Sequence, residues 1–161
     1  MTEKDIIITK ATAQHLQAVN DLSYKIFEYH NRLLPNFFNN PGTPDLAQHY
    51  KNPENREDAI FLVALKEQKV IGYLLALILN KPWQKVQPVC NIEEFGVCEA
   101  ERHQGVGTAL FDAIKKECQK RNVPKIVLNV YTKNSHAVEF YKKMGCQTIS
   151  QRMDLDIKKS P

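Results

Sequence analysis

Residues 91–110, NIEEFGVCEAERHQGVGTAL, run from a strand through a polar loop into an amphipathic helix. The strand is expected to end near Val97, and the helix opens at Gly105 and Gly107. Glycines at a helix entrance leave successive backbone N–H groups unshielded by side chains. Together with the helix dipole these groups form a site for phosphate oxygens, and Arg102 adds a positive charge beside it. The stretch therefore predicts a binding site for a phosphorylated ligand.

Two other glycine motifs do not fit this loop. The run 105–110 lacks the third glycine of a dinucleotide fingerprint, and it follows a long charged loop instead of a tight turn. The chain contains no Gly-Lys-Ser or Gly-Lys-Thr, which excludes a nucleotide P-loop. Taken alone, the two glycines fit an ordinary capped helix equally well.

The patterns on either side of this stretch predict the order β-α-loop-β-β-β-α-β-α-β. Apolar runs and alternation predict strands at Ile6–Ile8, Ile60–Lys66, Val70–Leu79, Val89–Val97, Ile126–Val130 and Ile149–Ile157. Helical spacing predicts helices from Thr12 to His30, from Gly105 to Arg121 and from Ser135 to Met144, with a short helix near Asp45–Tyr50 in a proline-rich loop. Consecutive strands imply antiparallel pairing, and the later strand-helix-strand unit implies a parallel step. We therefore predict an α+β fold with a mixed sheet, in a single domain over residues 1–161.

The composition is typical of a soluble globular chain, with 43% hydrophobic and 25% charged residues. The polar start at Met1–Asp5 is unlike a signal peptide, and the longest apolar stretch, Tyr73–Leu79, is too short to span a bilayer. We therefore expect a cytoplasmic protein that does not enter the membrane. The net charge is +4, and the lysines and arginines are scattered along the sequence. This charge distribution is compatible with binding a small anionic ligand at least as well as nucleic acid.

Cysteine and histidine spacing argues against metal chemistry. The four cysteines lie far apart in the chain, so we interpret them as small buried residues without disulfides. None of the five histidines stands in a spacing typical of metal ligands, and we predict no metal.

A second cluster, NSHAVEFYKKMGC at residues 134–146, follows the next expected strand. With the first stretch it resembles the GNAT superfamily of acetyl-CoA-dependent N-acetyltransferases. That family carries an R/Q-x-x-G-x-G/A loop and then an N-x-x-A-x-x-x-Y-x-K-x-G-F helix. The first motif is matched by Arg102, Gly105 and Gly107, and the second by Asn134, Ala137, Tyr141, Lys143 and Gly145. Cys146 replaces the phenylalanine, which changes packing only, and the resemblance covers about residues 60–157.

The resemblance implies a mostly antiparallel sheet of six to seven strands, helices on both faces, and a parallel step at two strands that splay apart. Acetyl-CoA would be the co-substrate, with its pantetheine arm in that opening. The backbone of Phe95 and Val97 would bond the pantetheine, and the Val97 N–H would polarise the thioester carbonyl. The remaining cofactor contacts are expected from Arg102, His103, Gln104, Gly105, Val106, Gly107, Thr108 and Asn134.

The implied reaction is direct attack of a primary amine on the thioester. A free alkylamine has a pKa of about 10.4, so a proton must be accepted. We choose Glu93, which shares a side of its strand with Phe95 and Val97 and resembles the base position of several family members; its alternative role is to pair with a cation. Tyr141 would protonate the departing thiolate, against the alternative of a core aromatic residue. Asn134 fits a helix N-cap equally well.

The acceptor is not specified by the sequence. The family places acceptor binding in the first helix and the following loop, which here contribute Tyr29, His30, Phe37 and Phe38, with Leu34, Pro35 and Trp83 nearby. This set is aromatic and almost free of acid, which disfavours a polyamine or an aminoglycoside. A protein or peptide N-terminus, an amino acid and a small amine all remain open as acceptors. Lys142 and Lys143 would reach the 3′-phosphate of CoA or remain solvated.

Two other classes of protein compete with this hypothesis. One is a non-catalytic CoA-binding or protein-interaction module on the same fold, which the retained Tyr141 and Glu93 disfavour. The other is a nucleic-acid-binding domain, for which no stripe of basic and aromatic residues is present. We also expect a homodimer, with the strand after Gln151 as an edge for pairing or exchange.

Overall fold

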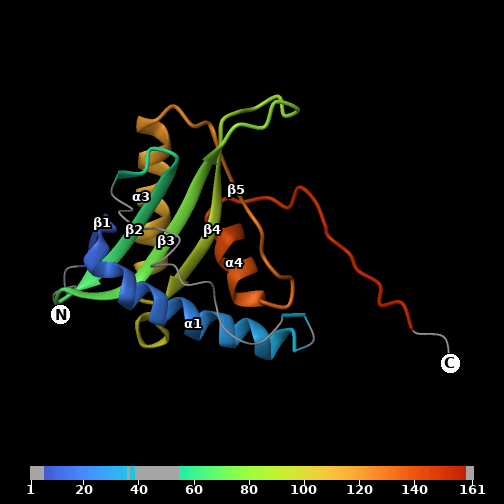
Figure 1. Cartoon of the computed structure of the whole chain (residues 1–161), viewed down its shortest axis with the longest axis horizontal. Coiled ribbons are helices and arrows are strands. Elements are labelled where there is room, and N and C mark those ends of the chain that lie inside the picture. The colour runs from blue at the N-terminus through green and yellow to red at the C-terminus, as the bar shows by residue number, and fades with distance from the viewer. Residues whose placement is uncertain (1–5, 36, 39–54, 159–161) are drawn as a thin grey trace.

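The computed structural model describes residues 6–35, 37–38 and 55–158. The described strands form one sheet in the order β1-β2-β3-β4-β5, in which only β4 and β5 run parallel (Figure 1). The strands are β1 (Ile7–Lys10), β2 (Ala59–Lys66), β3 (Lys69–Leu79), β4 (Val89–Val97) and β5 (Lys125–Leu128). The helices are α1 (Leu16–Leu33), α3 (Val106–Lys120) and α4 (Ser135–Lys143), with short 3-10 turns at Ala13–His15 and Glu99–Glu101.

The prediction of six to seven strands is wrong for the described residues, which form five. The expected last strand, Ile149–Ile157, has no strand partner, and residues 147–158 extend away from the sheet and helices (Figure 1). A segment with alternating apolar side chains can form a strand, but it does so only when a neighbouring backbone supplies hydrogen bonds. The short helix expected near Asp45–Tyr50 lies outside the described residues.

Helices cover both faces of the sheet, as predicted. On one face, α3 buries Val106, Leu110 and Ile114 against alternate residues of β2 and β3. On the other face, α1 buries Leu16, Val19 and Leu22 against the intervening residues of the same strands. Because successive side chains of a strand point to opposite faces, β2 and β3 are buried on both sides, which explains their nearly continuous apolar sequence (Figure 1).

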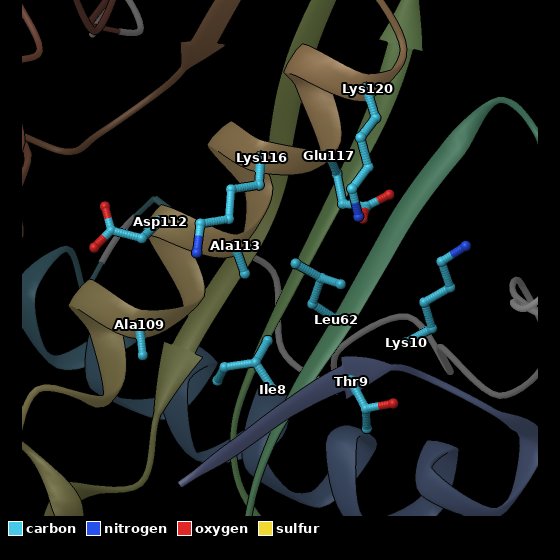
Figure 2. Close-up of a pocket in the computed structure, with 10 residues that line it drawn as sticks. All are labelled: Ile8, Thr9, Lys10, Leu62, Ala109, Asp112, Ala113, Lys116, Glu117 and Lys120. Carbon is cyan, nitrogen blue, oxygen red and sulfur yellow. The ribbon is translucent and has the colours of Figure 1, made fainter.

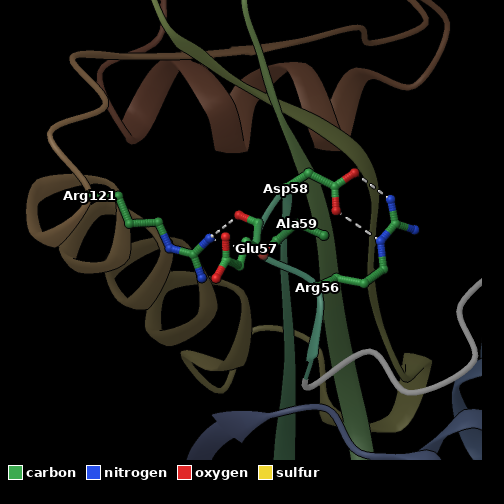
Figure 3. Close-up of polar contacts among 5 residues, drawn as sticks. All are labelled: Arg56, Glu57, Asp58, Ala59 and Arg121. Atoms are coloured by element: carbon green, nitrogen blue, oxygen red, sulfur yellow. Dashed lines mark hydrogen bonds and ion pairs between the residues drawn. The ribbon is translucent and has the colours of Figure 1, made fainter.

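The predicted antiparallel pairing of β2 with β3 is confirmed, and the two strands form a hairpin. Its turn residues, Glu67 and Gln68, have φ angles of 49° and 63°, the left-handed pair that matches the twist of adjacent strands. At the other end of β2, Arg121 at the end of α3 donates hydrogen bonds to the carbonyl oxygens of Glu57 and Ala59, at 2.9 and 3.2 Å (Figure 3). These bonds tie the end of α3 to the start of the strand that it covers.

No helix in the described part of the chain is long and apolar enough to cross a membrane.

Candidate active site

Strands β4 and β5 pair over only part of their length. Their register runs from Val89 opposite Lys125 to Ile92 opposite Leu128, where β5 ends while β4 continues to Val97. The break coincides with an irregularity in the pairing of β3 with β4, where the register passes from Leu75–Glu94 to Ala76–Ile92 and leaves Glu93 as an extra residue. Bulges of this kind bend a strand and increase its twist. The parallel pairing of β4 with β5 is confirmed, and its end at Ile92 and Leu128 fits the predicted separation of the two strands.

The backbone of the unpaired part of β4 faces this opening. Cys98 donates its N–H to the Ile71 carbonyl at 2.8 Å, so this opposed pair is hydrogen bonded. Opposed residues in antiparallel strands alternate between hydrogen-bonded and non-bonded pairs. Moving along β4 from Cys98, the pair of Val97 is non-bonded, that of Gly96 is bonded and that of Phe95 is non-bonded. The N–H and C=O groups of Phe95 and Val97 consequently point away from β3, toward the side that β5 has left. The orientation is the one that the sequence hypothesis requires of these two residues.

The entrance of α3 presents free amide groups. His103 and Gly105 have positive φ angles of 61° and 80°, and in the described part of the chain the N–H groups of Gly105, Gly107 and Thr108 find no hydrogen-bond acceptor. Alternation of left-handed and right-handed residues turns successive N–H groups toward one side, forming a concave anion site. The loop therefore has the backbone geometry of a phosphate site, and residues 102–105 are exposed to solvent.

Two contacts refine the predicted roles in this loop. Arg102 donates to the Val97 carbonyl at 3.4 Å, and its guanidinium lies 5.8 Å from the ring centroid of Tyr29. This contact brings Tyr29, expected to bind the acceptor, next to Arg102, expected at the pyrophosphate. Gly105 is constrained by its positive φ angle, and a Cβ atom there would meet no other atom within 4 Å. At Gly107 the constraint is steric, because a Cβ atom would lie 3.3 Å from the Phe140 ring. A side chain at this position would therefore press on α4 before it reached a ligand.

Tyr141 lies in an aromatic cluster between α3, α4 and β4. Its ring centroid is 5.4 Å from that of Phe140 and 6.2 Å from those of Phe95 and Phe111. Burial raises the pKa of the phenol well above its ordinary value, and no described residue accepts a hydrogen bond from its hydroxyl. The phenol is therefore protonated at neutral pH and has a proton to donate, although its packing also fits the alternative of a core aromatic residue.

The two glutamates of β4 have different surroundings. Glu93, the predicted base, is exposed, and its carboxylate accepts a hydrogen bond from the Asn91 amide. Glu94 is half-buried, and its Oε2 accepts hydrogen bonds from the hydroxyls of Ser23 at 2.9 Å and Tyr73 at 2.8 Å. Both donors are buried, so this carboxylate is held in one position on the α1 side of the sheet. No local pattern in the sequence marks Glu94 as a site residue, because its partners come from distant elements.

The predicted acceptor residues at the end of α1 form a second aromatic cluster. Tyr131, which follows β5 and was not predicted, has its ring centroid 5.4 Å from that of His30 and within 5.7 Å of those of Phe37 and Phe38. Asn134 links this cluster to α4, because its side chain contacts His30 Nε2 at 3.3 Å and accepts a hydrogen bond from the Ala137 N–H at 3.3 Å. Burial lowers the pKa of His30, which favours the neutral ring.

Trp83 and a surface hollow between β1 and α3 are not part of this candidate site. Trp83, expected near the acceptor, is 81% exposed and has no ring contact among the described residues. A hollow of about 570 Å³ lies between β1 and α3 and contains none of the predicted site residues (Figure 2). Charges of both signs surround it, and Lys120 is paired with Glu117 at 2.8 Å, so no single ligand charge is favoured. Within residues 6–35, 37–38 and 55–158, no cluster of side chains could hold a metal ion.

The fold and this geometry define an α+β protein with free amide groups at a helix entrance and a mixed sheet whose parallel strands, β4 and β5, pair over only part of their length. Residues 24–146 match the acetyltransferase (GNAT) family, and the chain belongs to that family.

Relatives in sequence and structure agree with this assignment. The chain is 31% identical over 98 residues to an N-alpha-acetyltransferase of Sulfurisphaera tokodaii, covering 57% of this chain and 59% of that protein. It is 34% identical over 74 residues to the uncharacterized protein YxbD of Bacillus subtilis, covering 42% and 46%. The chain thus spans about half the length of the curated relatives that it matches.

Two solved structures share the fold over nearly the whole chain. A variant of the BH1408 protein of Bacillus halodurans superimposes with a TM-score of 0.85 and 26% identity, covering 94% of this chain and 99% of that one. AAC(6')-Iy, solved with the bisubstrate analogue CoA-S-monomethyl-acetylneamine, has a TM-score of 0.70 and 16% identity, covering 96% and 99%. The second likeness is one of fold alone.

Proposed function

We propose that this protein is an N-acetyltransferase that moves the acetyl group of acetyl-CoA to a primary amine by direct attack in a ternary complex. The observation that carries the proposal is the opening after Ile92 and Leu128, into which the backbone groups of Phe95 and Val97 point. The family assignment supports acetyl transfer, and the neighbour solved with a CoA-containing analogue supports a CoA site in this fold.

The binding of acetyl-CoA follows from backbone groups. Its pantetheine would take the place of a neighbouring strand along Phe95 and Val97, because β5 ends before it could pair with them. The Val97 carbonyl would first have to release its 3.4 Å contact with Arg102. Its pyrophosphate would lie on the free amides of Gly105, Gly107 and Thr108, with the charge of Arg102 beside it. Asn134 would hold the cofactor only if it gave up part of its contact with His30.

Proton transfers would use Glu93 and Tyr141. Glu93 is exposed on the bulge beside the opening, so it can accept a proton from the amine directly or through water. The Val97 N–H would stabilise the negative charge that develops on the thioester oxygen. Tyr141 would protonate the departing thiolate. Its phenol is in the donor form at neutral pH, although the burial that raises its pKa also makes it a weaker acid.

The acceptor would bind against the aromatic cluster of His30, Phe37, Phe38 and Tyr131. These rings offer apolar surface to the body of an amine, and neutral His30 adds no repelling charge. A small-molecule amine or a peptide N-terminus is the acceptor class that fits, and one matched relative is named an N-alpha-acetyltransferase.

Two measurements test the proposal. Acetyl-CoA should raise the melting temperature, because a ligand that binds only the native state adds about 2.7 kcal/mol of stability at about 100 times its dissociation constant. A panel of amines and peptides should then reveal acetyl-dependent release of CoA thiol. Binding without thiol release across the panel would favour the non-catalytic CoA-binding module, and absence of any thermal shift at millimolar acetyl-CoA would refute both.

A further inference from the structure

An ion pair joins the end of β2 to the loop that leads into α3. Lys66 Nζ lies 2.6 Å from Oε2 of Glu101, the last residue of the 3-10 turn before that loop enters the helix. Only 22% of the Lys66 side chain and 20% of the Glu101 side chain are exposed. Solvent therefore screens this pair less than it screens an ion pair on the open surface.

Few residues of this loop pack against the body of the protein. Among residues 99–105, Glu101 is half-buried and all the others are exposed. The Cys98 N–H, which donates to the Ile71 carbonyl at 2.8 Å, fixes the start of the loop, and the buried Val106 fixes its end. Between these two points, the side chain of Glu101 ties the middle of the loop to the sheet.

The same pair neutralises a negative charge beside amides that would bind an anion. Glu101 directly precedes Arg102 in the chain. An unpaired carboxylate here would repel a phosphate and compete with it for the Arg102 guanidinium. Lys66 neutralises Glu101 from the side of the sheet, and in the described part of the chain no carboxylate pairs with Arg102. The charge of Arg102 therefore stays available to a ligand.

We propose that Lys66 and Glu101 are positioning residues, whose ion pair holds the α3 entrance in the shape that binds the pyrophosphate of acetyl-CoA. The inference rests on the proposed function, because it takes acetyl-CoA as the ligand of this entrance. It adds two residues that belong to neither sequence motif and lie 35 positions apart. A small displacement of the loop would matter, because misplacing a group by about 1 Å can cost about 10²-fold.

The first test measures the dissociation constant for acetyl-CoA by calorimetry. Glu101→Gln and Lys66→Met should each raise it about tenfold, and the double variant should be no worse than either, because each change breaks the same pair. The sign for Glu101→Gln is decisive, since removing a negative charge near a pyrophosphate would by charge alone tighten binding. Lys66→Arg keeps the pair and should bind acetyl-CoA as the wild type does.

A matched control lies on α3 itself. Lys115 pairs with Asp112 at 3.0 Å, and 46% and 48% of these two side chains are exposed. Lys115→Met should therefore leave the dissociation constant unchanged. If Glu101→Gln binds acetyl-CoA as tightly as the wild type or more tightly, the inference is overturned while the proposed function stands. A lower melting temperature in Lys66→Met at an unchanged dissociation constant would also overturn it, because the pair would then only stabilise the fold.

The second test needs no ligand. NMR relaxation gives order parameters for the backbone amides of residues 102–105, where about 0.85 indicates a rigid backbone and less than about 0.6 a flexible one. Lys66→Met should lower these values in the free protein, and Lys115→Met should not. Failure of the wild type to bind acetyl-CoA would refute the proposed function, and a fall in the order parameters would still support positioning of the loop by the pair. Unchanged order parameters in Lys66→Met would overturn the inference.

Discussion

Residues 59–64 of β2 and 71–76 of β3 are all buried, whereas no residue from Pro124 to Lys158 is buried. We call β2, β3 and α3 the packed region, and residues 124–158 the open region. Helices cover the packed region on both faces. The open region contains a four-residue edge strand, a helix with no buried residue and the exposed C-terminal segment.

This difference separates most of the contacts that stabilise the fold from most of the groups proposed to bind a ligand, and the exposed entrance of α3 is the exception. Side chains of the packed region are already removed from water, so their contacts stabilise the fold. The open region keeps polar backbone and apolar side chains exposed, which is expected where a ligand or partner completes the structure. Tyr141, Asn134, β5 and the exposed C-terminal segment all belong to it. Four pairs of substitutions test this division.

Tyr141→Phe should produce the largest change. It keeps the ring and its packing but removes the proton donor, so turnover should fall by roughly 10²–10⁴-fold, the usual range for one acid–base group. The loss will be smaller if the thiolate, whose thiol has a pKa of about 8.5, leaves unprotonated. Steady-state thiol release, with cofactor affinity from calorimetry, measures this. Tyr24→Phe, at an exposed position of α1, is the control. Unchanged turnover in folded Tyr141→Phe would make Tyr141 only a packing residue.

Leu110→Ala should lower the free energy of unfolding, because it leaves a cavity in the packed region. Leu110 has no exposed surface, and removing a buried leucine side chain costs about 2–5 kcal/mol of unfolding free energy. Met144→Ala, in the half-buried part of the open region, should cost roughly 1 kcal/mol, since fewer buried contacts are lost. Urea denaturation compares the two. Equal losses would show that the open region contributes to the core as much as the packed region does.

Glu93→Gln and Glu94→Gln should separate a chemical role from a structural one. Glu93 is exposed, so its change should leave the melting temperature alone and lower turnover by about 10²-fold if it accepts the proton. Glu94 receives hydrogen bonds from Ser23 and Tyr73, so its change should lower the melting temperature. If Glu94→Gln instead loses turnover at an unchanged melting temperature, the proton acceptor is Glu94.

Thr108→Glu should give the smallest change. A glutamate in the first turn suits the helix, so the fold should not suffer. Its charge would repel a pyrophosphate at this entrance by about 1.4 kcal/mol, for an effective dielectric constant of about 40 at about 6 Å. The dissociation constant for acetyl-CoA should therefore rise about tenfold. Gln119→Glu adds the same charge at the other end of α3 and should have no effect. Equal affinity in both variants would move the phosphate site elsewhere.

Local patterns predicted most of the elements. β4 has the predicted bounds Val89–Val97, and β2 and β3 pair antiparallel as predicted. Asn134 is the N-cap of α4, one of its two predicted roles, and Gly145, with a φ of 94°, follows that helix. The residues responsible lie within a few positions of each other, so their effects can be read from the sequence alone. The roles predicted for Glu93, Tyr141 and the α3 entrance stay predictions.

Contacts between distant segments could not be predicted in this way. Ser23 and Glu94 are 71 positions apart, and the ring of Tyr131 meets those of His30, Phe37 and Phe38 only after β5 has been placed beside β4. No sequence pattern identifies such pairs, because each of these residues also fits the helix, strand or loop in which it lies.

The sequence by itself determined which segments can be strands and helices, where the glycines stand, and to which family the two motifs belong. Only the tertiary structure decided that β4 and β5 part after Ile92 and Leu128, and that the segment ending at Lys158 has no strand beside it in its own copy. The physical reason is that alternation is a property of one segment, whereas strand pairing is a hydrogen-bonded contact between two.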